Sequence, residues 1–168
     1  AQVVAPHDKA IIGEVNAITN FDNVFHLSES DAKAKGLLTI IGKEVDDKFI
    51  AAVKKEVVVN KSIIEKMGKD FKIVYTPLHG AGNVACQRIL KEVGLESVYV
   101  VKEQEQPDGN FPTASYPNPE DPKVFELGIK LAEEKGAKIV MANDPDADRI
   151  GIAVKTKKGE WVFPNGNQ

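Results

Sequence analysis

The sequence predicts an α/β fold: a three-layer α/β/α domain around a mixed, mostly parallel four-stranded sheet whose last strand is antiparallel. Short β-type runs alternate with amphipathic helical stretches between residues 43 and 158, and this alternation is typical of helices packed on both faces of a sheet. Only residues 143–149 separate the last two β-type runs. A parallel pair needs a crossover of about a dozen residues, so these two strands should be antiparallel neighbours.

Apolar spacing and helix-ending residues predict the individual elements. The expected helices are a short one within residues 1–18 and longer ones at 45–58, 84–94 and 121–136. Asp121 and Pro122 suit the start of a helix, and Gly94 and Gly136 suit the end of one. The expected strands are residues 72–76, 97–101, 137–142 and 150–155.

Three segments are expected along the chain. Residues 43–158 carry the regular alternation and should form the α/β domain. Residues 1–42 should be the end of a preceding domain and a linker, because the polar run at 28–36 has the composition of a loop. Residues 159–168 should open a following domain. The chain starts without methionine and stops in a polar loop, which indicates a piece of a longer protein.

Charge and composition narrow the classes of function. The 22 basic and 25 acidic side chains are well mixed, the net charge is −3 and aromatic residues make up 7%, so no nucleic-acid partner is expected. No apolar stretch reaches the roughly 18 residues that span a bilayer, and no signal-peptide pattern opens the chain, so no membrane partner is expected. A single cysteine, Cys86, suits a reducing cytoplasm.

The most informative stretch is MANDPDADRIGIAV, residues 141–154, where Asp144, Asp146 and Asp148 alternate and Arg149 follows. Side chains two residues apart in an extended strand lie about 6.6 Å from each other. Because Mg²⁺ binds oxygen at about 2.0–2.1 Å, the segment must curl to hold an ion. Oxygen ligands favour magnesium, manganese or calcium over zinc. The motif follows a strand at the end where open α/β sheets bind ligands, so it predicts a metal site.

Two other interpretations of this acidic stretch are weaker. Solvated turns favour one or two aspartates with glycine or asparagine, and not three in strict alternation. An EF-hand calcium loop needs glycine at its sixth position and a carboxylate at its twelfth, where this chain has Arg149 and Lys155. Spacing alone therefore indicates a metal and leaves the reaction open.

Five segments carry a more specific resemblance: PHDKAIIGEV (6–15), YTPLHGAGN (75–83), VKEQEQPDGNFPTASYPNPE (101–120), DPDADRIGIAV (144–154) and PNGNQ (164–168). They are similar, in the same order and at similar spacing, to segments of the α-D-phosphohexomutase superfamily, the phosphoglucomutases and phosphomannomutases. The resemblance covers nearly the whole chain. It implies that residues 43–158 are the second, metal-binding domain of a four-domain enzyme.

The resemblance also implies an activity. In the family, a phosphoserine of the first domain gives its phosphoryl group to a hexose phosphate, and the bisphosphate returns the other phosphoryl group, which interconverts hexose 1-phosphate and hexose 6-phosphate. Carried over, Asp144, Asp146 and Asp148 would bind Mg²⁺, and Arg149 would be the catalytic residue that assists the phosphoryl group. The partners would be the hexose phosphate and the other domains of the same chain. Without the phosphoserine domain, the piece is expected to be inactive.

Ser115 and His79 are further polar residues in loops. The stretch PTASYPNP superficially resembles the family's phosphoserine loop, but Tyr116 stands where that loop has histidine. Ser115 also lies 29 residues before Asp144 (144 − 115), in the place of a second-domain loop, so we expect it to be a loop residue and not a nucleophile. The turn PLHGAG lacks the lysine of a P-loop, so His79 and the glycines beside it are expected to be structural.

Three functions from different classes are compatible with the residues. The favoured one is the metal-binding domain of a phosphohexomutase. The second is a self-contained, metal-dependent phosphatase or phosphotransferase that uses an aspartate of the cluster as nucleophile. The third is a non-catalytic calcium-binding module. In the favoured case, the preference for glucose or mannose is expected to depend largely on other domains.

Overall fold

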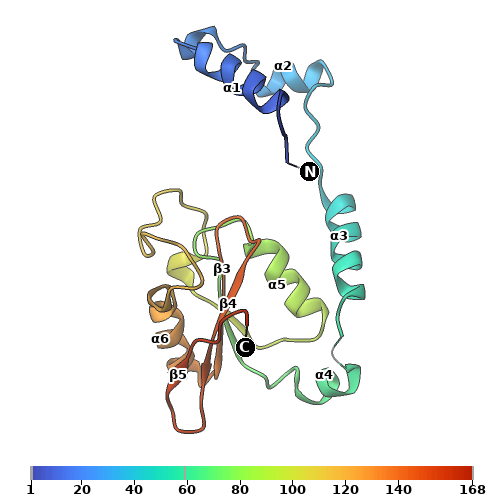
Figure 1. Ribbon diagram of the computed structural model, residues 1–168. Helices are drawn as coiled ribbons and strands as arrows, with labels where there is room; N and C mark the ends of the chain where they lie inside the picture. The colour runs from blue at the N-terminus through green and yellow to red at the C-terminus, as the bar shows by residue number, and fades with distance from the viewer. Residues whose placement is uncertain (1, 59, 168) are drawn as a thin grey trace. The chain divides into compact units, whose positions relative to one another are not determined.

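The computed structural model describes residues 2–58 and 60–167, and its ribbon is drawn in Figure 1. Backbone contacts divide the chain into two compact units, residues 1–44 and 45–168. The β-sheet lies in the second unit.

The first unit consists of short helices. The helix predicted within residues 1–18 is confirmed as α1 (His7–Ala17), and a 3-10 turn, η1 (Phe21–Asn23), follows it. The loop expected at residues 28–36 is wrong, because α2 (Glu29–Ala34) lies there. The Ser28 hydroxyl accepts a hydrogen bond from the Asp31 amide at 3.1 Å and so caps the start of α2. Among the described residues of α1 and α2, none is buried.

The second unit is built on a five-stranded sheet in the order β2-β1-β3-β4-β5. The strands are β1 (Ile73–Thr76), β2 (Val98–Val100), β3 (Ile139–Asn143), β4 (Ile150–Lys155) and β5 (Trp161–Val162). β1 pairs in parallel with β2 and β3, whereas β4 is antiparallel to β3 and β5 is antiparallel to β4. The predicted mixed α/β sheet is confirmed, but it has five strands instead of four. A strand of two residues is too short to show a period, and β5 was missed for that reason.

The helices of the second unit include one that the sequence pattern did not predict. The elements are α3 (Lys43–Lys55), α4 (Lys61–Met67), α5 (Asn83–Glu92), η2 (Lys102–Gln104), η3 (Pro122–Phe125) and α6 (Glu126–Lys135). α4 is the unpredicted helix. The helix expected at 121–136 begins as a 3-10 turn capped by Asp121 and ends at Gly136, whose φ of 68° lies in the left-handed region. Of the helices in the described residues, none is long and apolar enough to cross a membrane.

Neighbouring side chains of β1 show that α5 and α6 cover opposite faces of the sheet. A Cβ placed on Gly128 of α6 would lie 3.7 Å from Val74 Cγ1 and 2.6 Å from Val140 Cγ1. The next residue, Tyr75, directs its hydroxyl to the other face, where Cys86 of α5 lies. Successive side chains of a strand point to opposite faces, so the sheet lies between two helical layers, as Figure 1 shows. The main core is on the α6 face and contains Val74, Val140, Phe125 and Ala132.

Candidate metal centre

The aspartate turn, residues 144–149, connects the carboxyl end of β3 to β4. Ala147 has a φ of 60°, and its amide donates a hydrogen bond to the Asp144 carbonyl oxygen at 3.0 Å, so the segment is curled. Asp144 is only 2% exposed, whereas Asp146 and Asp148 are exposed. One carboxylate oxygen from each of the three lies within 4.8 Å of the others. The three aspartates singled out in the sequence therefore converge.

Arg149 holds the buried Asp144 carboxylate in place. The Arg149 backbone amide donates to Asp144 Oδ1 at 2.9 Å, and the Arg149 Nε donates to Oδ2 at 2.8 Å. Burial alone would raise the pKa of Asp144, but these hydrogen bonds from Arg149 outweigh burial and lower it. Asp144 is therefore an anion with a fixed orientation at neutral pH.

The neighbouring aspartates change the pKa of Asp148. The pKa of Asp148 is raised mainly by a hydrogen bond with Asp144 and, to a smaller extent, by charge repulsion from Asp146 and Asp144. Like charges held this close are unfavourable unless a cation offsets them. The cluster thus has the electrostatic character of a cation site.

The Arg149 side chain also reaches a second loop. Its Nη1 donates to Asn118 Oδ1 at 3.2 Å, and the side chain remains about half exposed. Asn143 Nδ2 donates to the Arg149 carbonyl oxygen at 2.8 Å, which fixes the backbone on the other side. The sequence indicated that Arg149 would assist a phosphoryl group, but it did not indicate the contact between Arg149 and Asn118. In the structure two of the guanidinium donors are engaged by Asp144 and Asn118, and Asp148 Oδ1 lies 3.7 Å from the Nε atom.

The loop after β1 packs against the aspartate turn. The Ala81 amide donates to the Pro145 carbonyl oxygen at 2.8 Å. A Cβ on Gly80 would lie 2.4 Å from Pro145 Cα, so only glycine fits there. β1 and β3 are parallel neighbours with Thr76 opposite Ala142, and their carboxyl ends therefore bring the two loops together. The glycines of PLHGAG were expected to be structural, and at Gly80 the structural reason is the close approach of the Pro145 backbone.

His79 and Ser115 differ in their surroundings. His79 is buried and both ring nitrogens are within hydrogen-bonding distance of protein oxygens, Gln106 O at 3.2 Å and Thr113 Oγ1 at 2.8 Å, as expected for a structural histidine. Ser115 is an exposed residue of the loop between β2 and η3.

Comparison with known families identifies the domain. The family model described as "Phosphoglucomutase/phosphomannomutase, alpha/beta/alpha domain II" matches residues 47–159. The chain belongs to this family. A probable phosphomannomutase of Haemophilus influenzae is 36% identical over 99% of this chain, and the phosphoribomutase of Saccharomyces cerevisiae is 35% identical over 99%. This chain spans only 32% and 28% of the length of those two relatives.

A solved bacterial structure shares the fold. A Thermus thermophilus protein assigned as a phosphomannomutase superposes with a TM-score of 0.53 and 22% identity, over 83% of this chain and 32% of its own length. The similarity supports the α/β/α architecture of the second unit.

The residues of this phosphoglucomutase/phosphomannomutase domain fit a hard divalent cation. Oxygens bound to one octahedral Mg²⁺ at about 2.1 Å lie about 3–4 Å apart. The carboxylate oxygens of Asp144, Asp146 and Asp148 are within 4.8 Å of one another, so a small inward movement of the two exposed side chains is sufficient. The donors are all oxygens, and the crowded negative charge favours a cation.

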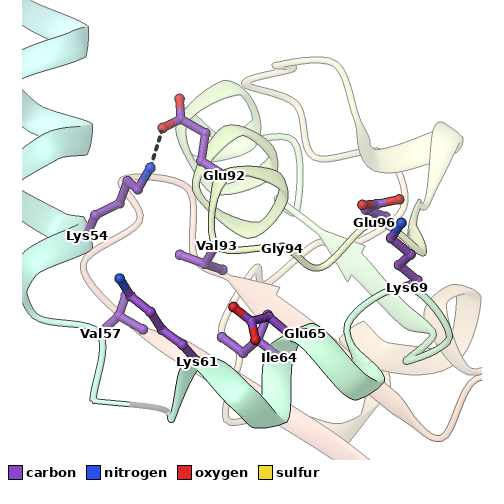
Figure 2. A pocket seen from close by; sticks show the side chains of 10 residues that line it. All are labelled: Lys54, Val57, Lys61, Ile64, Glu65, Lys69, Glu92, Val93, Gly94 and Glu96. Carbon is purple, nitrogen blue, oxygen red and sulfur yellow. Dashed lines mark hydrogen bonds and ion pairs between the residues drawn. The ribbon is translucent and has the colours of Figure 1, made fainter.

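A pocket away from the aspartate turn lies between α3, α4 and the end of α5 (Figure 2). Its volume is about 530 Å³, and it does not include the aspartate turn. Basic and acidic side chains alternate around it, namely Lys54, Lys61, Lys69, Glu65, Glu92 and Glu96, and Lys54 pairs with Glu92 at 3.1 Å. Because the opposite charges offset each other, this pocket has no marked preference for an anionic phosphate. The aspartate turn is the stronger candidate site.

Proposed function

We propose that this chain supplies the metal-holding part of the active site of a sugar-phosphate mutase that interconverts hexose 1-phosphate and hexose 6-phosphate. The observation that carries the proposal is the convergence of Asp144, Asp146 and Asp148 at the carboxyl end of β3, in a domain of the phosphoglucomutase/phosphomannomutase family. Relatives named as phosphomannomutase and phosphoglucomutase support the reaction class.

Each residue of the turn has a distinct part in this proposal. Asp144, Asp146 and Asp148 hold Mg²⁺, with Asp144 oriented by the two hydrogen bonds from Arg149. The bound ion supplies Lewis-acid stabilisation of negative charge on a phosphoryl group. Arg149 is the catalytic residue: its half-exposed guanidinium binds phosphoryl oxygens, while Asn118 and Asp144 keep the group at the turn.

The domain organisation is part of the proposal. Residues 1–42 are assigned to the end of a preceding domain and a linker, 43–158 to the metal-binding domain and 159–168 to the start of a following domain. The phosphoserine that donates the phosphoryl group lies in another domain of the family, so this chain alone should not turn over substrate. Its partners are then the hexose phosphate and the other domains, in the cytoplasm.

Magnesium titration of the 168-residue chain tests the site. Asp146 is exposed, so Asp146→Asn should leave the fold intact while it replaces a charged carboxylate ligand with a neutral amide. We expect Mg²⁺ affinity, measured by calorimetry, to be weak in the wild type and to fall by about 100-fold or more in this variant. Asp70→Asn, at another exposed carboxylate, is the matched control and should bind like the wild type. Equal binding by all three proteins would reject the site.

A mutase assay tests the activity. The 168-residue chain and a chain extended to the length of its relatives are compared with glucose 1-phosphate, mannose 1-phosphate and ribose 1-phosphate in the presence of Mg²⁺. We expect conversion only by the longer chain, and we expect it to be reduced by Asp146→Asn. Because one relative is a phosphoribomutase, the pentose decides whether the substrate is a hexose. Release of phosphate by the short chain would instead support a phosphatase.

A further inference from the structure

Unusual backbone conformations gather around the aspartate turn. In residues 2–58 and 60–167, the non-glycine residues with positive φ are Leu78 at 46°, His79 at 62°, Phe111 at 46° and Ala147 at 60°. They lie in the loops that follow β1, β2 and β3. Such conformations are costly for residues with a Cβ and persist only where the surroundings hold them. The loops at this edge of the sheet are therefore held by specific contacts.

A hydrogen-bonded polar chain, Thr76–Gln104–Thr113–His79, holds the two strained residues after β1. The Leu78 amide donates to Thr76 Oγ1 at 3.1 Å, and that hydroxyl donates to Gln104 Oε1 at 2.7 Å. Thr76 and Gln104 are 0% and 1% exposed, so water does not replace these bonds. The strained conformation of Leu78 thus depends on a buried side-chain pair.

The polar chain continues to His79 with a consistent direction of donors. Gln104 Nε2 donates to Thr113 Oγ1 at 3.1 Å, and Thr113 Oγ1 lies 2.8 Å from His79 Nε2. The Gln106 carbonyl oxygen can only accept, so His79 Nδ1 must donate to it. In neutral His79 the Nε2 atom then accepts from the Thr113 hydroxyl. These hydrogen bonds fix the ring of His79, and the His79 amide, which donates to the Gln104 carbonyl oxygen at 2.9 Å, fixes its backbone.

The residues directly after His79 form the contact with the aspartate turn. Gly80 lies against the Pro145 backbone, the Ala81 amide donates to the Pro145 carbonyl oxygen, and a Cβ on Gly82 would lie 3.0 Å from the Ala147 Cβ. Movement of the 78–79 backbone would therefore be transmitted to Pro145 and Ala147, on either side of Asp146.

We propose that Thr76 and Thr113, acting through Gln104 and His79, are positioning residues that set the conformation of the aspartate turn and thereby its affinity for a divalent cation. The coupling between the loops stands on the contacts themselves, and its consequence for metal binding rests on the proposed function. Neither threonine touches the carboxylates. Their effect is transmitted through the loop after β1.

Two threonine variants separate this role from simple packing. Thr76→Val keeps the shape of the side chain and removes the hydroxyl, whereas Thr76→Ser keeps the hydroxyl and removes the methyl group. Both should lower overall stability, because Thr76 is buried. Only Thr76→Val should release Leu78 and, with it, the aspartate turn. Thr113→Val and Thr113→Ser repeat the contrast at an exposed residue, where the substitutions should not prevent folding.

Amide hydrogen exchange measures the coupling without any metal. The reporters are the Ala81, Ala147 and Arg149 amides, which donate to Pro145 O, Asp144 O and Asp144 Oδ1. We expect exchange at these amides to be at least about tenfold faster in each valine variant than in the matching serine variant, relative to amides within β1 and β3. Equal rates in valine and serine variants would overturn the proposal.

Magnesium titration of the same variants tests the consequence. Outer contacts that orient metal ligands typically change affinity by about 10- to 100-fold. We expect a loss of that size in the valine variants and near wild-type affinity in the serine variants. If the wild type binds Mg²⁺ and all variants bind alike, the positioning role is overturned and the metal site stands. If the wild type does not bind Mg²⁺, the proposed function fails, and the exchange comparison still decides the coupling.

Discussion

The carboxyl edge of the sheet and helix α3 are held in opposite ways. At the edge, backbone meets backbone: Gly80 lies against Pro145, and a Cβ on Gly151 would lie 2.2 Å from the Pro119 carbonyl oxygen. Polar side chains such as Thr76 are buried there and hydrogen-bonded. In α3, by contrast, only Ile50 is buried among the described residues, and Phe49 is 58% exposed.

This difference indicates where the molecule tolerates change. Buried backbone contacts and buried hydrogen bonds have no solvent to replace them, so their loss is costly. Exposed ion pairs contribute little to stability, because water solvates the separated charges. Exposed apolar side chains likewise lose few contacts when they are replaced. The edge that carries the candidate metal site should therefore be sensitive to small changes, and the exposed side of α3 should not.

Gly151→Ala should produce the largest effect. The added methyl group would overlap the Pro119 carbonyl oxygen, a backbone atom that cannot rotate away, so β4 or the loop before η3 must shift. We expect the free energy of unfolding in urea to fall by about 3 kcal/mol. Gly109→Ala is the control, because nothing lies within 4 Å of a Cβ there, and it should change stability by less than about 1 kcal/mol. A Gly151→Ala protein as stable as the control would contradict the tight contact at this edge.

Local sequence chemistry predicted both ends of the helical segment at 121–136. Asp121 and Gly136 bound their helical segment as expected, because capping depends on neighbouring residues only. α2 and α4 were missed although Ser28 and Asn60 are helix-capping residues that accept from Asp31 and Ser62 amides. Helices of 6 and 7 residues are too short for apolar spacing to reveal them.

The candidate site was predictable in its chemistry but not in its support. The aspartates are neighbours in sequence, so their convergence needs only a local curl. Gln104 and Thr76 are 28 residues apart, and their contact depends on which strands are adjacent. The alternation of helices and strands predicts parallel pairing without giving the strand order. The roles of Gly80, Thr76 and Asn118 therefore became visible only in three dimensions.

Arg88→Gln should have a smaller effect than Gly151→Ala, and one that depends on salt. Arg88 joins α5 to α3 through Asp47 at 2.6 Å and pairs with Glu92 at 2.8 Å, and these groups are partly exposed. We expect a small decrease of the urea midpoint at about 0.01 M salt that disappears near about 1 M, because exposed charges are screened. Lys91→Gln, also on α5, is the control. If the urea midpoint of Arg88→Gln is still lowered at high salt, Arg88 stabilises the protein by more than screened ion pairs.

The same ion pairs should respond to pH with a defined sign. Hydrogen bonds from Arg88 and Lys54 lower the pKa of Glu92 in the folded protein. Their contribution to stability is therefore present above the unfolded pKa of Glu92 and is lost as the pH falls through the lowered, folded value. In Arg88→Gln the decrease of the midpoint should accordingly be visible at neutral pH and vanish in acid. A decrease that grows on acidification would contradict the assignment.

Phe49→Ser should have the smallest effect on the folding of the second unit. Phe49 lies on α3, and its side chain is 58% exposed, so little apolar contact is lost when it is removed. We expect the free energy of unfolding to change by less than about 0.5 kcal/mol. Ile50→Ser is the matched contrast, since the neighbouring side chain is 3% exposed and should cost several times more. If Phe49→Ser is as destabilising as Ile50→Ser, the Phe49 side chain is buried in solution. The contrast between the sheet edge and α3 would then rest on the exposed ion pairs of α3 alone.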